Sequence, residues 1–126
     1  MVPGIPGGSE KSIGPGRKDN RMKANKADQN KMRYDLIPPS TLKALATILT
    51  FGAIKYGDRN WENGIVWGRV FAALMRHLWS WWQGEENDQE SGESHLWHAQ
   101  CNLSFLIEYR ATHPELDDRN TKKERR

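Results

Sequence analysis

The sequence predicts an all-α protein, a helical bundle of about three main helices. Apolar residues recur at intervals of three and four positions in separate segments, whereas β-branched residues are scarce and no stretch alternates between apolar and polar residues. Three helices of about five turns make a thin core, yet the 126-residue chain carries 6 Trp. We therefore expect a homo-oligomer in which helices from several subunits complete the bundle.

Both ends of the chain are polar and basic. Residues 1–16 contain 5 of the 11 Gly and 3 of the 6 Pro, a composition typical of disordered segments. We predict a disordered leader over 1–30 with a net charge of +3, an ordered domain over 31–116 with −2, and a disordered tail over 117–126 with +2. Because the positive charge lies in the ends, we expect no specific nucleic-acid partner.

The first helix is predicted from just after two prolines to about Tyr56. Ser40 follows those prolines and is a candidate N-cap. Behind it, apolar residues recur at i, i+3, i+4 and i+7, the stripe of an amphipathic helix: Leu42, Leu45, Ala46 and Leu49. The Gly- and Asn-containing turns of residues 57–64 then leave Trp61 between two loops.

The second helix is predicted from Ile65 or Trp67 to about Gln83, with Gly84 as its stop. Its apolar face should be formed by Val70, Phe71, Leu74, Met75 and Leu78. Three further Trp extend this face nearly all the way round the helix: Trp79, Trp81 and Trp82.

A third helix is predicted to follow the polar loop of residues 84–94. Ser94 is its candidate N-cap, and the helix should end before Pro114. We expect its core face to be formed by Leu96, Ala99, Leu103, Leu106 and Ile107.

The loop and the third helix carry the strongest chemical signal. Half of the 10 acids of residues 31–116 lie in this loop, and His95, His98 and Asn102 share one face of the helix that follows. Carboxylates and imidazoles without a set of thiolates suit a divalent ion such as Mg²⁺ or Mn²⁺. The predicted metal ligands are Glu85, Asp88, Glu90, His95 and His98. We predict catalytic roles for Glu85 and His77; the alternative is that the histidines are structural groups hydrogen-bonded to the acids.

A second group of residues suits a nucleotide. Lys55 and Arg59 bring two cations to the end of the first helix, beside an amide and an indole ring. Phosphates bind Lys and Arg donors, and a base packs on a flat apolar surface. The predicted substrate-binding residues are Lys55, Arg59, Asn60, Trp61, Arg76 and Asn102. The alternative is a helix C-terminus with favourable basic residues and a structural Trp.

Four blocks resemble, in order, the N-terminal domain of phage dATP/dGTP diphosphohydrolases, the MazZ-like proteins: KMRYDLIPP at 31–39, GAIKYGDRNW at 52–61, RH at 76–77 and GEENDQESGESHLWHAQCN at 84–102. The resemblance implies hydrolysis of a purine deoxynucleoside triphosphate to the monophosphate and pyrophosphate, which in some phages supplies dGMP for modified-purine synthesis. It also implies kinship in activity with the all-α MazG-like pyrophosphohydrolases, which bind Mg²⁺ or Mn²⁺. The MazG pattern has Glu-x-x-Glu and Glu-x-x-Asp on successive helices. Here Glu90-x-x-Glu93 lies in a loop and His95-x-x-His98 begins the next helix.

Two other functions stay open. An HD-like phosphohydrolase would use a His/Asp metal centre, although an adjacent His-Asp pair is absent from the sequence. A non-enzymatic phage accessory protein would bind nucleic acid through the basic ends, which leaves the acids and histidines unexplained. The single Cys101 excludes a disulfide framework and a multi-cysteine zinc site. With neither a long apolar run nor a secretory signal, we expect a cytoplasmic protein without a membrane partner, in the host cytoplasm if phage-encoded.

Overall fold

The computed structural model describes residues 24–120, and the chain divides into two compact units, Met1–Ile37 and Pro38–Arg126. Of the predicted leader, residues 1–23 lie outside the described residues, and 24–30 form no helix or strand. The first unit ends in a short 3₁₀ helix, η1 (Tyr34–Leu36). Beside it, the Arg33 guanidinium donates to the Asp35 carboxylate at 2.9 Å.

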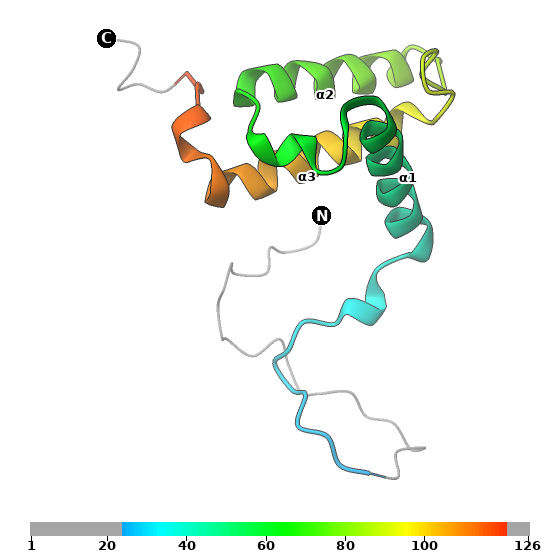
Figure 1. The fold of residues 1–126 in the computed structure, drawn as a ribbon. Helices are drawn as coiled ribbons and strands as arrows, with labels where there is room; N and C mark the ends of the chain where they lie inside the picture. The colour runs from blue at the N-terminus through cyan, green and yellow to red at the C-terminus, as the bar shows by residue number, and fades with distance from the viewer. Residues whose placement is uncertain (1–23, 121–126) are drawn as a thin grey trace. The chain divides into compact units, whose positions relative to one another are not determined.

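The second unit contains three α-helices, α1 (Pro39–Tyr56), α2 (Trp67–Trp82) and α3 (His95–Thr112), and two short 3₁₀ helices, η2 (Asn60–Asn63) and η3 (Pro114–Leu116). Helices α2 and α3 lie side by side as a hairpin, and α1 stands at an angle to them and packs against α3 (Figure 1). Within residues 24–120 there is no β-strand, only an isolated bridge between Asn87 and Ser94. The predicted all-α class is confirmed. No helix in this part of the chain is both long and apolar enough to cross a lipid bilayer.

The helix ends follow the predicted signals in two of three cases. The Ser94 hydroxyl accepts from Leu96 N at 3.1 Å and caps α3, as predicted. Gly84 follows the end of α2 with a φ of +102°, a conformation that does not continue the helix. Glycine suits this position because a side chain there would strain the backbone. Ser40 as the N-cap of α1 is wrong, because the helix already begins at Pro39. A proline suits that first position, since its φ is fixed near the helical value and it has no N–H to satisfy.

The core lies between the start of α2 and the end of α3. Trp67, Val70 and Tyr109 form its buried cluster, and the Tyr109 side chain is 0% exposed. The Tyr109 hydroxyl donates to Trp61 O at 2.5 Å, and the Trp61 ring stacks on Phe105 with 5.1 Å between centroids. These contacts attach η2 to the α2–α3 hairpin, so Trp61 is part of the packing of the domain.

Two predicted core faces are only partly correct: Leu45 and Leu49 on α1 are half-buried, and Ala99 on α3 is buried. On α1, Leu42 and Ala46 are exposed, whereas the buried residues are Ala44 and Ile48. On α3, three predicted core residues are exposed: Leu96, Leu103 and Ile107. The reason is that α3 packs against two helices, α2 and α1, and its buried positions include small residues that let neighbouring backbones approach: Ala99 and Cys101.

On α2, the predicted apolar face is only partly buried. Val70 and Leu74 are covered, but Phe71, Met75 and Leu78 are exposed. Of the predicted tail, residues 117–120 are described. The Asp118 carboxylate accepts from Gly68 N at 2.8 Å, which places an acid at the positive end of the α2 dipole.

Candidate active site

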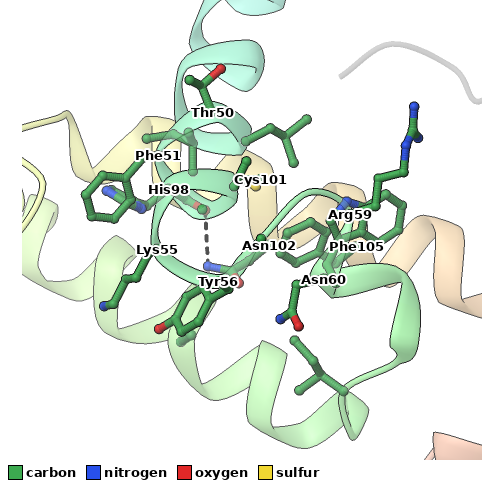
Figure 2. Close-up of a pocket in the computed structure, with 18 of the residues that line it drawn as sticks. Thr50, Phe51, Lys55, Tyr56, Arg59, Asn60, His98, Cys101, Asn102 and Phe105 are labelled. Atoms are coloured by element: carbon green, nitrogen blue, oxygen red, sulfur yellow. Dashed lines mark hydrogen bonds between the residues drawn. The ribbon is translucent and has the colours of Figure 1, made fainter.

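A cavity of about 890 Å³ opens among the C-terminal half of α1, η2, α2, the loop of residues 83–94 and α3. Lys55 and His98 lie on one side of it, and Asn60 and Phe105 on the other (Figure 2). Its ionisable lining includes Lys55, Arg69, His77, Asp88, Glu90 and His98. Its aromatic and amide lining includes Phe51, Tyr56, Asn60, Trp61, Asn102 and Phe105. Charged groups and flat apolar surfaces therefore share one cavity.

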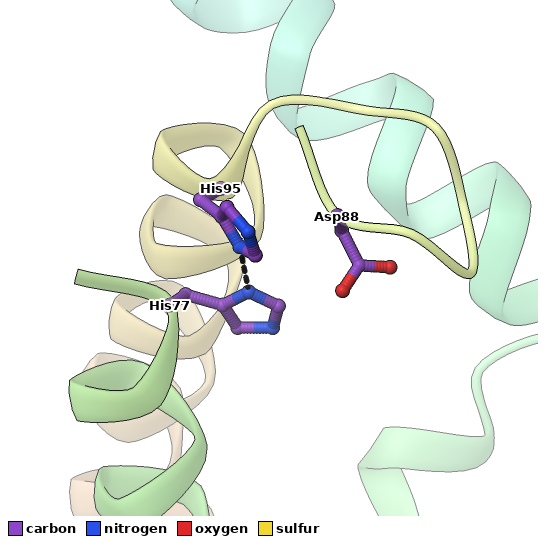
Figure 3. A group of neighbouring side chains, drawn as sticks. All are labelled: His77, Asp88 and His95. Atoms are coloured by element: carbon purple, nitrogen blue, oxygen red, sulfur yellow. Dashed lines mark hydrogen bonds between the residues drawn. The ribbon is translucent and has the colours of Figure 1, made fainter. Parts of the chain in front are cut away.

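Three side chains from three segments meet beside this cavity: His77 from α2, Asp88 from the loop and His95 from the start of α3 (Figure 3). One donor atom from each lies within 4.8 Å of the other two. Nδ1 of His77 and Nδ1 of His95 are 2.8 Å apart. The turn at Gly84 reverses the chain between α2 and α3, which is what brings these residues together.

His95 is held from behind by Glu85. Its side chain is buried, with the residue 4% exposed, and its Nε2 lies 2.7 Å from Glu85 Oε1. Because an ionised carboxylate only accepts hydrogen bonds, Nε2 of His95 is the donor. Its other ring nitrogen, Nδ1, faces Nδ1 of His77 and is placed to share a hydrogen bond with it or to bind a cation. Glu85 itself is not among the residues that line the cavity.

The loop fixes the Asp88 carboxylate. Asp88 Oδ2 accepts from Ser91 N at 2.9 Å and from Glu90 N at 3.1 Å. Burial alone would raise the pKa of Asp88, but the hydrogen bonds from Ser91 and the nearby His98 outweigh it, so the pKa lies below its ordinary value. Asp88 is therefore ionised at neutral pH.

The two histidines at the cavity wall are neutral at the same pH. Burial, helped by the neighbouring His98, lowers the pKa of His77 to about 4. Burial also lowers the pKa of His98, despite the opposing charge of Asp88. The two rings stack with 4.6 Å between centroids, and His98 Nε2 lies 2.6 Å from the Ser91 hydroxyl. Neutral imidazoles offer the lone pair that a metal ion or a proton needs.

An ion pair links the end of α1 to the acidic loop. The Lys55 ammonium donates to the Glu90 carboxylate, and both residues line the cavity. The hydrogen bond with Glu90 raises the pKa of Lys55 above its ordinary value. A cation and an acid are thus held together at the edge of the cavity.

Not every predicted site residue lines the cavity. Glu85 and His95 lie behind His77, and Arg76 is exposed on α2 away from the lining. Arg59 contributes to the lining, but its guanidinium pairs with Glu62 at 3.2 Å and extends away from the other labelled side chains (Figure 2). Nine predicted residues do line it: Lys55, Arg59, Asn60, Trp61, His77, Asp88, Glu90, His98 and Asn102.

Several lining residues were not predicted as site residues, among them Phe51, Tyr56, Arg69 and Phe105. For Arg69 a signal exists, since Arg69, Ala73 and His77 recur every four residues and lie on one face of α2. The small Ala73 leaves room between the two larger side chains of this row.

The resemblance seen in the sequence is confirmed by comparison with known proteins. Residues 21–119 match the profile of a family described as dATP/dGTP diphosphohydrolase, N-terminal. A relative named dATP/dGTP diphosphohydrolase, from Salmonella phage PMBT28, is 34% identical over 94 residues, which are 75% of this chain and 32% of the relative. The chain thus spans about a third of that relative's length. No solved structure matches the chain. The chain belongs to the dATP/dGTP diphosphohydrolase N-terminal family.

Proposed function

We propose that this domain hydrolyses a purine deoxynucleoside triphosphate, dATP or dGTP, to the monophosphate and pyrophosphate. The observation that carries the proposal is one cavity that holds ionisable groups beside aromatic rings and amides. A triphosphate requires the first kind of group and a purine the second. The name of the phage relative supports the substrate.

A divalent metal ion is part of the proposal, with His77, Asp88 and His95 as its ligands. The donor atoms are close enough to share one ion, and the lowered pKa values of His77 and Asp88 leave both unprotonated at neutral pH. Two imidazoles and one carboxylate favour Mn²⁺ over Mg²⁺, which prefers oxygen ligands. A bound ion would polarise the phosphoryl oxygens and offset the charge of the triphosphate.

Glu85 has a supporting role in this proposal. Its contact with Nε2 of His95 directs Nδ1 of the same ring toward His77. Carboxylates behind ligating histidines commonly fix the ring and raise its basicity. Glu85 and His77, both predicted as catalytic, would therefore act by building the metal site.

Lys55 and Glu90 would act in the reaction itself. When a phosphate takes the Lys55 ammonium, Glu90 loses its partner and becomes available as a general base. A water oxygen then bonds to the α-phosphorus while the bond from that phosphorus to the bridging oxygen breaks. The water proton passes to Glu90 and pyrophosphate leaves. Arg69, at the same cavity, is a second phosphate ligand.

The remaining lining suits the base and sugar. Phe51, Tyr56 and Phe105 offer aromatic surface, and Trp61 supports Phe105 by stacking on it. Asn102 Nδ2 donates to His98 O at 3.1 Å, which orients the amide (Figure 2). Its oxygen is then the atom offered to a purine N–H donor.

Product analysis in ¹⁸O-labelled water tests the proposal. Purified protein with Mn²⁺ or Mg²⁺ is incubated with a panel of deoxy- and ribonucleoside triphosphates, and the products are resolved by chromatography. We expect pyrophosphate and a purine deoxynucleoside monophosphate that carries the label. Asp88→Asn should abolish the reaction, whereas Glu108→Gln, an exposed acid on α3, should leave it unchanged. Release of tripolyphosphate, or full activity of Asp88→Asn, would contradict the proposal.

A further inference from the structure

The α2–α3 hairpin exposes many large apolar side chains, which we call the outer face. Five lie on α2 and three on α3, and their exposed fractions range from 36% to 70%. These residues are Phe71, Met75, Leu78, Trp79, Trp82, Leu96, Leu103 and Ile107. Contiguous apolar surface of this kind on a folded domain indicates an interaction site.

The two helices contribute to the same side of the hairpin. On α2, the buried residues at positions 67, 70 and 74 form a row that faces α3. The cavity-lining residues at positions 69, 73 and 77 lie on one side of this buried row, and the outer-face residues lie on its other side. On α3, the row that faces α2 lies between the cavity-lining residues at positions 98, 102 and 105 and the outer-face residues at positions 96, 103 and 107. The order of the three rows around the helix is the same as on α2. Because α2 and α3 run antiparallel, both outer rows lie on the hairpin face opposite the cavity.

The extent and chemistry of the outer face fit a second copy of this chain. Aromatic side chains bury roughly 150–250 Å² each, so covering all eight residues would remove on the order of 900 Å² per copy, close to the ~800 Å² per partner of a standard interface. The α2 row contains no charged residue, and its aromatic residues lie at both ends, around Met75 and Leu78. A row of this kind complements itself when two copies pack antiparallel.

Charge selects the relative direction of the two copies. The loop end of the hairpin carries the exposed acid Glu86, and the opposite end carries the exposed Arg110 in the last turn of α3. Loops at the same end would bring Glu86 of both copies together. Loops at opposite ends bring Glu86 of each copy toward Arg110 of the other, which favours that arrangement.

We infer that two copies of this chain pack outer face to outer face, with their loops at opposite ends, and form a four-helix bundle from the two α2–α3 hairpins. The arrangement leaves the cavities on the outside of the dimer, since each cavity lies on the opposite side of its hairpin. It does not depend on what the cavity binds.

The mass of the chain in solution tests the inference. Light scattering and sedimentation over a wide concentration range should give twice the mass of one chain. Trp79→Glu and Leu103→Glu should each halve this mass, because each buries a charge in the interface. Ile54→Glu, on α1 and 83% exposed before substitution, is the matched control and should keep the doubled mass. Far-UV circular dichroism checks that every variant remains helical.

Two results would overturn the inference. One is a wild-type protein with the mass of one chain at every concentration, which would assign the outer face to a different partner. The other is loss of the doubled mass in Ile54→Glu to the same degree as in Trp79→Glu.

A charge exchange tests the relative direction of the two copies: Glu86→Arg and Arg110→Glu should each weaken the dimer, and the two substitutions together should restore it. A double variant weaker than either single variant would contradict loops at opposite ends.

Discussion

Glu85 Oε1 lies 2.7 Å from Nε2 of the buried His95, on the side of that ring away from His77. Because an ionised carboxylate only accepts hydrogen bonds, Nε2 of His95 is the donor in this contact. It leaves Nδ1 of His95 as the atom that meets His77. Glu85 can thus shape the site without touching a ligand in the cavity.

Removal of the Glu85 carboxylate should weaken metal binding. We expect Glu85→Ala to lower Mn²⁺ affinity roughly 10- to 100-fold, the usual effect of losing a partner behind a ligating histidine. Glu85→Gln should be milder, since its amide oxygen can still accept from Nε2. Calorimetric titration measures both, with Glu86→Ala as control. If Glu85 were itself a ligand, as its sequence position predicted, Gln should bind as poorly as Ala.

Tyr109 should contribute strongly to stability through one hydroxyl. Tyr109→Phe leaves Trp61 O without its donor and should lower the free energy of unfolding by about 1–3 kcal/mol. Urea unfolding followed by circular dichroism measures the change. Tyr34→Phe, at an exposed position of the first unit, should change it by less than about 0.5 kcal/mol. Equal effects of the two substitutions would show that the buried hydrogen bond contributes nothing.

The metal-free protein should lose stability as the pH falls below neutral. The pKa of His77 is about 4 in the folded state against an ordinary value of 6.5, so the unfolded chain binds the proton first. The contribution of neutral His77 to the free energy of unfolding is therefore complete above pH 6.5, and it is lost as the pH falls from 6.5 toward 4. Urea midpoints across this range measure the loss. His77→Gln should reduce the slope, and an unchanged slope would remove His77 as its source.

Lys55 and Glu90 should affect different kinetic constants. Lys55→Met removes a phosphate ligand and should raise the KM for a nucleoside triphosphate roughly 10-fold, the effect of one charge-assisted hydrogen bond. Glu90→Gln removes the proposed base and should lower kcat far more than it changes KM. Steady-state kinetics with dATP and dGTP separate the two. A Glu90→Gln enzyme with normal kcat would place the base elsewhere.

The two arginines of α2 should differ in nucleotide binding. Arg69 lines the cavity, whereas Arg76 does not. We expect Arg69→Ala to weaken binding of a non-hydrolysable purine triphosphate and Arg76→Ala to leave it unchanged. Equilibrium titration measures both. The reverse order would favour the sequence-based assignment of Arg76 and count against the cavity as the phosphate site.

The positions of the helices could be predicted because local signals decide them. Ser94 and Gly84 act within one turn of their own backbone, and both are read from the sequence. The buried faces could not be predicted in the same way. On α3, Leu103 satisfies the apolar spacing as well as Ala99 does, but Ala99 is buried and Leu103 is exposed. Which of two apolar rows is covered depends on packing partners, and spacing alone does not specify them.

Many of the residues that line the cavity could be predicted from the sequence, but which of the predicted residues reach the cavity and which lie behind it could not. A short loop between two helices brings His77, Asp88 and His98 near one another whatever the details of the turn. Whether Glu85 or Glu90 reaches the cavity depends on the direction of the chain after Gly84, which spacing in the sequence does not encode. Arg69 was missed because its row on α2 acquires meaning only beside the cavity.

The contacts of residues 118 and 119 with the start of α2 affect how this domain can be cut or joined to others. Asp118 accepts from Gly68 N, and the Arg119 guanidinium lies 5.0 Å from the Trp67 ring centre. A Cβ on residue 68 would come within 2.6 Å of the Asp118 carboxylate, so the two positions are closely fitted. A fragment truncated at Leu116 would therefore lose both contacts with the first turn of α2, the turn that carries Arg69. A fusion joint placed after residue 120 would preserve it.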